Sequence, residues 1–203
     1  MNSISVAKMK SNRKMLLILF FAFLLPAVIS FGMYFTQWRP SSTVNHGELI
    51  LPARNIEDRS MQTLDDNKVK FSDLNGKWTM VYFDSSECSE ACISQLYFMR
   101  QIHASLGKNY DKMQRLLVLT DTKNLVELKT KLPEYKDMLV WKSDSSAISK
   151  LQQDFGVDTK IPSTEKYIYL VDQLGNQMMQ YKMGSEPAGV RKDLERLLKY
   201  SGN

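Results

Sequence analysis

Two cysteines, Cys88 and Cys92, are the only cysteines of this 203-residue chain, and their spacing suits redox or metal chemistry. They lie four positions apart, between a predicted strand and a predicted helix, where helix geometry separates their Cα atoms by about 6 Å. A disulfide requires about 4.4–6.8 Å, and the same spacing lets two thiolates hold one Cu(I) ion. We therefore predict that Cys88, the more exposed thiol, is the catalytic nucleophile and that Cys92 resolves its adducts. The alternatives are a Cu(I) site formed by both sulfurs and a pair of unrelated buried thiols.

The residues near this pair in the sequence are acidic. Glu87 and Glu90 flank Cys88, and no lysine, arginine or histidine lies between Trp78 and Arg100. A helix N-terminus stabilises a thiolate, but neighbouring carboxylates destabilise it. We therefore expect a reductant or a metal-binding site rather than a strong oxidant.

Other residues that could bind a metal are less well placed. His103 follows Cys92 by eleven residues, about 16 Å along a helix, so it cannot share an ion with the two sulfurs. We expect it to be a surface or partly buried helix residue. His46 lies in a segment that would have to fold back to reach the cysteines. Lys129 and Lys131 are expected to lie on a solvated helix face.

Strand and helix patterns alternate from residue 78 onward and would position the cysteine turn. Apolar runs rich in β-branched and aromatic residues predict strands at 78–84, 115–120, 138–141, 166–172 and 176–182. Apolar residues at helical spacing predict helices at 90–106, 124–132, 145–155 and 186–200. A small hairpin that turns at residues 66–67 precedes them. This order predicts an α/β fold, a thioredoxin-like sandwich whose central sheet is flanked by helices.

The positive charge of the chain is concentrated at its N-terminus. The formal net charge is +5, but residues 1–39 hold five of the 27 basic residues and no acidic one. The other 22 basic residues balance the 22 acidic residues, which removes the main argument for a nucleic-acid partner.

An uncharged run of 22 residues, 15–36, predicts a transmembrane helix. Because basic residues precede it, the positive-inside rule places the N-terminus in the cytoplasm and the following domain outside, in the periplasm of a cell with an inner membrane. A cleaved signal peptide is the alternative. The predicted segments are a basic cytoplasmic tail (1–14), a transmembrane helix (15–37), a tether (38–51) and the thioredoxin-like domain (52–203).

Short motifs between residues 67 and 175 resemble the Sco (SenC) family of cytochrome c oxidase assembly proteins. In chain order they are NGK (75–77), VYF (81–83), the C-x-x-x-C of CSEAC (88–92), LVLTD (117–121) and YLVDQLG (169–175). The resemblance implies a membrane-anchored thioredoxin-like domain associated with the copper centre of oxidase subunit II. It also implies copper as the metal, and subunit II or other oxidase assembly factors as partners.

Two positions depart from that family. Ile93 follows the second cysteine, where the family usually has proline, and Thr164 stands where its distal histidine ligand is expected. Two thiolates without an imidazole suit Cu(I) but not Cu(II). The chain therefore resembles a divergent member that lacks the third ligand. Nearby Pro162 invites comparison with the cis-proline that faces the cysteines of thioredoxin-like proteins.

Three functions fit these features. The first is a membrane-anchored thiol–disulfide oxidoreductase in oxidase assembly, which requires no cofactor. The second is a Cu(I) metallochaperone that uses both thiolates. The third is a non-catalytic assembly factor that only docks to other membrane proteins.

Overall fold

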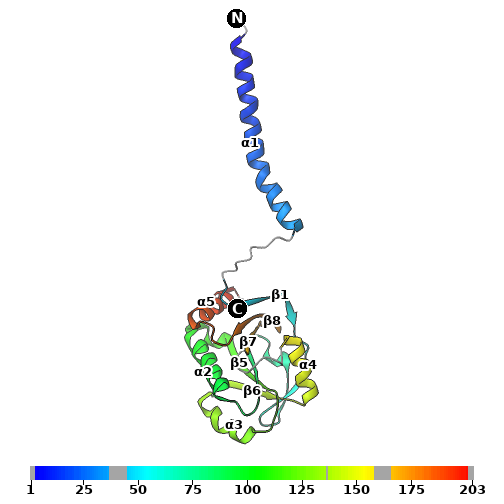
Figure 1. Cartoon of the computed structure of the whole chain (residues 1–203), viewed down its shortest axis with the longest axis vertical. Helices are drawn as coiled ribbons and strands as arrows, with labels where there is room; N and C mark the ends of the chain where they lie inside the picture. Colours follow the sequence, from blue (N-terminus) through cyan, green and yellow to red (C-terminus); the bar gives the residue numbers. More distant parts are fainter. Residues whose placement is uncertain (1–2, 37–44, 136, 158–165, 201–203) are drawn as a thin grey trace. The chain divides into compact units, whose positions relative to one another are not determined.

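The computed structural model describes residues 3–36, 45–135, 137–157 and 166–200, and the chain divides into two compact units (Figure 1). The N-terminal unit is Met1–Val44 and the globular unit is Asn45–Asn203.

The N-terminal unit contains one helix, α1 (Ser3–Thr36), within its described residues. Its segment Arg13–Thr36 has 24 residues and a mean hydropathy of 2.6, so it is long and apolar enough to cross a membrane. At 1.5 Å per residue this segment extends about 36 Å. Helix α1 also includes most of the predicted basic tail, because alanine, methionine, lysine and arginine favour helices.

The globular unit is built on a sheet that has eight strands in the described part of the chain, in the order β1-β8-β7-β4-β5-β6-β2-β3. The strands are β1 (Glu48–Asn55), β2 (Ser60–Thr63), β3 (Lys68–Lys70), β4 (Trp78–Asp84), β5 (Met113–Leu119), β6 (Met138–Lys142), β7 (Tyr167–Val171) and β8 (Asn176–Lys182). Strands β4, β5 and β6 are parallel, and the remaining pairs are antiparallel.

Helices cover both faces of this sheet (Figure 1). The α-helices are α2 (Glu90–Ser105), α3 (Leu125–Lys131), α4 (Ser145–Phe155) and α5 (Pro187–Tyr200), and the 3-10 helices are η1 (Phe71–Leu74), η2 (Gly107–Lys112) and η3 (Leu132–Tyr135). Helices α2, α3 and α5 contribute to the core on one face, and α4 contributes to the core on the other. The predicted α/β thioredoxin-like sandwich is confirmed.

The central strand β4 is buried along its whole length because both of its faces are covered. Met80 and Tyr82 lie in the core beneath α2 and α5, whereas Val81 and Phe83 lie in the core beneath α4. On the α4 side, the rings of Phe83 and Phe155 pack edge-to-face with centroids 5.2 Å apart. Successive strand residues point to opposite faces, so a doubly covered strand is largely apolar. This strand delivers the chain to the cysteine turn.

The start of the globular unit differs from the prediction. Strand β1 begins at Glu48, inside the segment predicted as a tether, and pairs antiparallel with β8. No strand pattern is visible in that segment, because most of β1 is exposed at the sheet edge and contains Pro52. The hairpin predicted at residues 66–67 is confirmed as β2–β3, and β2 also joins the main sheet by pairing with β6.

Candidate redox site

Cys88 and Cys92 form a disulfide with their Cα atoms 5.0 Å apart. Cys88 lies in the turn after β4, and Cys92 lies in the first turn of α2. The backbone N–H of Cys88 donates to the carbonyl oxygen of Ser85 at 3.2 Å, and its φ of 42° falls in the left-handed region. A side chain in that region costs about 1–2 kcal/mol, so a tightly constrained loop holds the first sulfur in place.

Both cysteines are buried, Cys88 with 1% and Cys92 with 0% of its surface exposed. Cys88 is the more exposed of the two, as predicted, but the difference is small. Packing buries both residues, because both belong to the core cluster beneath α2. Cys88 nevertheless borders a cavity of about 430 Å³, whose other lining residues are Glu87, Ser89, Glu90, Ile93, Ser94, Glu127 and Lys131.

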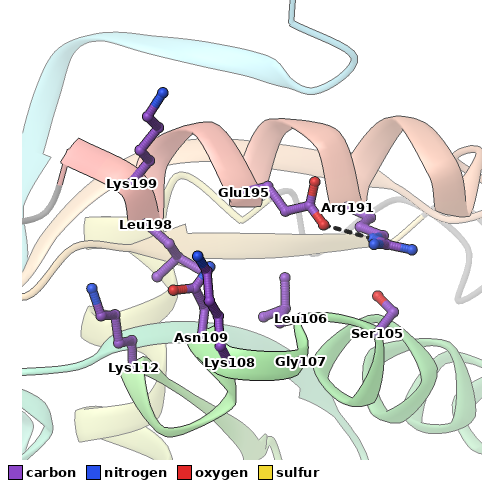
Figure 2. A pocket seen from close by; sticks show the side chains of 10 residues that line it. All are labelled: Ser105, Leu106, Gly107, Lys108, Asn109, Lys112, Arg191, Glu195, Leu198 and Lys199. Atoms are coloured by element: carbon purple, nitrogen blue, oxygen red, sulfur yellow. Dashed lines mark hydrogen bonds and ion pairs between the residues drawn. The ribbon is translucent and has the colours of Figure 1, made fainter.

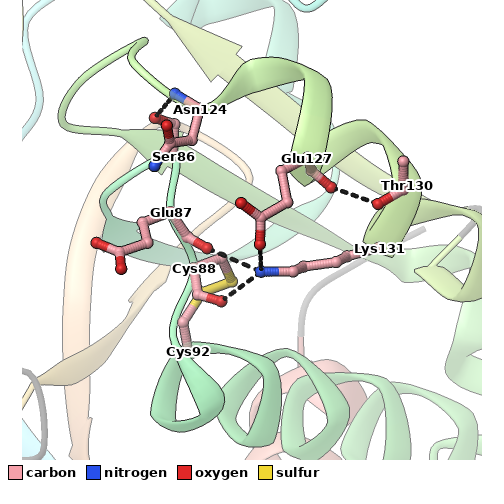
Figure 3. A network of polar contacts seen from close by, with 8 residues as sticks. All are labelled: Ser86, Glu87, Cys88, Cys92, Asn124, Glu127, Thr130 and Lys131. Carbon is pink, nitrogen blue, oxygen red and sulfur yellow. Dashed lines mark hydrogen bonds and ion pairs between the residues drawn. A yellow bond between two sulfur atoms is a disulfide. The ribbon is translucent and has the colours of Figure 1, made fainter.

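A lysine from α3 reaches this loop (Figure 3). The Nζ of Lys131 donates to the carbonyl oxygens of Glu87, at 3.0 Å, and Cys88, at 3.4 Å. It also forms an ion pair with Glu127 at 2.8 Å, and 31% of its side chain is exposed. The cysteine loop therefore contacts a cation that is distant in the sequence, and Lys131, expected on a solvated helix face, is only partly exposed.

Lys131 is 43 residues from Cys88 in the sequence, so no local pattern indicates that the two are in contact. A topological signal could have found it. Parallel neighbours β4 and β5 end at the same edge of the sheet, so the segments that follow them meet there. The cysteine turn follows β4, and α3 follows β5.

A second set of contacts connects the same two segments (Figure 3). The hydroxyl of Ser86 donates to the carboxylate of Asp121, and the backbone N–H of Asn124 donates to the Ser86 hydroxyl at 2.8 Å. Burial acts to raise the pKa of Asp121, but the hydrogen bonds from Ser86 and the Lys123 N–H outweigh it and hold that pKa below its usual range. The carboxylate therefore stays ionised and fixes the loop before Cys88.

A buried carboxylate ends strand β4. Asp84 accepts a hydrogen bond from the hydroxyl of Tyr82 at 2.7 Å and one from the backbone N–H of Ser85 at 2.8 Å, and it pairs with the ammonium of Lys166. Burial, together with the charge of Asp84, raises the pKa of Tyr82 well above its usual range. Tyr82 therefore remains a neutral donor, and Asp84 anchors the start of the turn that carries Cys88.

Neither histidine joins the sulfurs. His103 is 3% exposed, so the prediction that it lies at or near the surface is wrong. It accepts from the Nε of Arg115 at 3.2 Å, bonds the carbonyl oxygen of Tyr110 and stacks on the Tyr110 ring. Burial, aided by the charge of Arg115, lowers the pKa of His103, which keeps it neutral. His46 instead lies against Asp193 of α5.

The donor set at the site fits only a metal that accepts two sulfurs. Among the described residues, no group of three histidine, cysteine, aspartate or glutamate side chains could hold a metal ion. Reduced Cys88 and Cys92 would offer two thiolates, which suits Cu(I). Thr164 and Pro162, the positions compared with the family's histidine ligand and cis-proline, lie outside the described residues.

A larger cavity in the globular unit has a different character (Figure 2). It measures about 710 Å³ and lies between η2 and α5, and the described residues that line it include no cysteine or histidine. The cavity beside the disulfide is therefore the candidate for redox chemistry.

Comparisons with known proteins agree with this geometry. Residues 78–201 match the family described as "Transmembrane-like, thioredoxin-like, C-terminal domain". No curated protein sequence matches the chain. Copper-bound yeast Sco1 is 16% identical, with a TM-score of 0.63 over 74% of this chain and 96% of its own. Copper-bound ScoI of Bradyrhizobium japonicum is 20% identical, with a TM-score of 0.56 over 69% of this chain and 97% of its own.

A third solved structure with the same fold is of a protein described as a redox enzyme. The thioredoxin domain of a thiol-disulfide oxidoreductase from Bacteroides vulgatus is 16% identical, with a TM-score of 0.55 over 71% of this chain and 95% of its own. At these identities the solved structures establish the fold, and it is the fold of the Sco proteins. The family match covers more than half of the sequence, so the chain belongs to the family of transmembrane-like, thioredoxin-like C-terminal domains.

Proposed function

We propose that this chain is a membrane-anchored thiol–disulfide oxidoreductase that acts outside the cytoplasm in the assembly of cytochrome c oxidase. The observation that carries the proposal is the Cys88–Cys92 disulfide, which joins the turn after β4 to the first turn of α2 and borders an open cavity. The copper-bound Sco proteins and the thiol-disulfide oxidoreductase that share the fold support this assignment.

The reaction transfers two electrons from the chain to a client disulfide. The Cys88 thiolate attacks one client sulfur, which breaks the client disulfide and forms a mixed disulfide. The Cys92 thiolate then attacks the Cys88 sulfur, so the client leaves as a dithiol and the chain is left with its own disulfide. A donor dithiol must reduce that disulfide again. The proposed client is the cysteine pair that oxidase subunit II must present in reduced form to receive copper.

Helix α1 supplies the proposed anchor. Its segment Arg13–Thr36 has the length and hydropathy of a membrane span, and four basic residues lie in the first 14 residues of the chain. By the positive-inside rule, the globular unit would lie on the periplasmic side of the inner membrane, where subunit II or other assembly factors could meet it.

A Cu(I) metallochaperone is the second candidate, favoured by the copper in two of the structures with the same fold. Copper would be cargo here, held by the two reduced sulfurs. The disulfide must be reduced before such binding, so both candidates need the same dithiol.

Trapping the mixed disulfide tests the first proposal. The full chain, reduced and with Cys92→Ser, is mixed with a disulfide peptide that carries the copper-binding cysteine segment of an oxidase subunit II. Mass spectrometry should find a stable adduct through Cys88, whereas the matched Cys88→Ser variant should give little. No adduct with either variant would refute the oxidoreductase. Reduced wild-type chain that holds one Cu(I) against a competing chelator would then favour the metallochaperone.

A further inference from the structure

The cavity between η2 and α5 has a strongly cationic lining (Figure 2). Lys108 and Lys112 come from η2, and Arg191 and Lys199 come from α5. Among the described residues of the lining, the one carboxylate is Glu195, whose oxygen lies 2.8 Å from the Nε of Arg191. Four cations and one carboxylate thus border one cavity, whereas the globular unit as a whole has 22 basic and 22 acidic residues.

Helix ends explain only part of this charge. Lys112 and Lys199 lie in the last turns of η2 and α5, where the partial negative charge of a helix C-terminus favours cations. Lys108 lies at the start of η2, and Arg191 lies near the start of α5, so the same effect does not account for them. The cluster is therefore more positive than the local backbone requires.

The charged side chains suit a phosphate group. Arginine and lysine are the usual phosphate ligands, and the ion pair with Glu195 engages the Nε of Arg191. Leu106 and Leu198 also border the cavity, but they are buried, with 4% and 0% of their surface exposed. The cluster of cations matches the phosphate headgroup of an anionic phospholipid.

The start of the globular unit is hydrogen-bonded to helix α5. The backbone N–H groups of His46 and Gly47 donate to the carboxylate of Asp193 at 2.7 and 3.0 Å, so residues 46–47 are fixed to α5 two positions from Arg191. Eight residues, 37–44, separate α1 from Asn45 and can extend at most about 30 Å. If α1 crosses a bilayer, as proposed above, α5 stays within reach of the lipid surface.

We propose that the cavity between η2 and α5 binds the phosphate headgroup of an anionic phospholipid. The anchor makes this contact intramolecular, which raises the effective lipid concentration. Each basic residue near an anionic surface strengthens binding by a factor of roughly five. The inference rests on the membrane anchor of the proposed function, but not on the chemistry of the cysteines.

Lysine acetylation of the full chain in nanodiscs tests the proposal. The chain is incorporated into discs of phosphatidylcholine alone, or of phosphatidylcholine mixed with phosphatidylglycerol, and acetylation is read by peptide mass spectrometry. Lys108, Lys112 and Lys199 should be acetylated several-fold more slowly in the mixed discs. Lys68 and Lys70 on β3, at the opposite edge of the sheet from β1, should react equally in both discs.

Matched double variants separate a lipid site from general shielding. Lys108→Gln with Lys112→Gln should restore the acetylation of Lys199 in the mixed discs, whereas Lys68→Gln with Lys70→Gln should not. Equal rates in both discs would overturn the lipid assignment. Protection by inorganic phosphate in phosphatidylcholine discs would overturn it in favour of a soluble anion. A chain that does not enter either disc would refute the anchor, and this inference with it.

Discussion

Replacing Lys131 with methionine should slow the reaction of reduced Cys88 with an alkylating agent. The ammonium of Lys131 contacts the backbone of Cys88, with its Nζ 3.4 Å from the carbonyl oxygen. Methionine keeps a similar length and apolar stem but removes the charge. Without that charge the thiolate is less stable, so a smaller fraction of Cys88 is reactive at neutral pH.

The expected size of the effect follows from the surroundings of Lys131. An opposite charge within about 4–6 Å typically shifts the acidity of a group by about one to three pH units. The side chain of Lys131 is 31% exposed and its ammonium pairs with Glu127 at 2.8 Å, and both features weaken its effect. We therefore expect a shift at the lower end of this range. One unit corresponds to about 1.4 kcal/mol, or a tenfold change in thiolate fraction. The rate with iodoacetamide should therefore fall about tenfold, and the midpoint of its pH profile should rise by about one unit.

The chain offers close controls for this measurement. Lys129 lies on the same helix, but its ammonium pairs with Asp65 at 3.6 Å, so Lys129→Met should leave the rate unchanged. Lys131→Arg keeps the charge and should retain most of the rate. Glu127→Gln removes the competing carboxylate and should increase it. Equal rates for the wild type and Lys131→Met would refute the argument that this cation stabilises the thiolate.

Three further predictions concern stability. Asp193→Ala should lower the free energy of unfolding in urea by about 3 kcal/mol. The buried carboxylate accepts hydrogen bonds from two backbone N–H groups, and a hydrogen bond to a charged group contributes about 1.5–3 kcal/mol. A loss below about 1 kcal/mol would contradict this prediction. Burial lowers the pKa of His103 in the folded state. The wild type should therefore lose stability as the pH falls below about 6.5, the pKa of histidine in the unfolded chain. His103→Gln should reduce that loss. Phe155→Ala should cost about 3–5 kcal/mol in thermal unfolding, because its ring packs against three other aromatic rings; an unchanged melting temperature would contradict this.

Some elements of the globular unit have the bounds that the sequence predicts. Strand β4 matches its predicted bounds, 78–84, because a strand covered on both faces is largely apolar, and here only Thr79 and Asp84 are polar. Helix α4 also matches its predicted bounds, 145–155, with Asp144 capping its first turn and Gly156 ending it in the left-handed conformation. Local patterns determine these features, so they can be predicted from one sequence.

The features that were not predicted correctly depend on contacts between residues that are distant in the sequence. The partner of strand β1 is β8, more than 120 residues later, and its own residues are mostly exposed. Lys131 reaches Cys88 only because β4 and β5 are parallel neighbours. His103 is buried because Arg115 and Tyr110 supply its hydrogen bonds, which no helical periodicity indicates. In each case tertiary packing decides the environment.

The reduction potential of the Cys88–Cys92 pair tests the central claim most directly. The full chain is equilibrated with dithiothreitol or glutathione buffers, and the fraction of disulfide is read by mass after alkylation. The buried disulfide and the carboxylates of Glu87, Glu90 and Glu127 beside Cys88 favour a reductant, so the account predicts one two-electron transition near −270 mV, about the value of thioredoxin. A potential near −120 mV, about that of a strong oxidant, would contradict it.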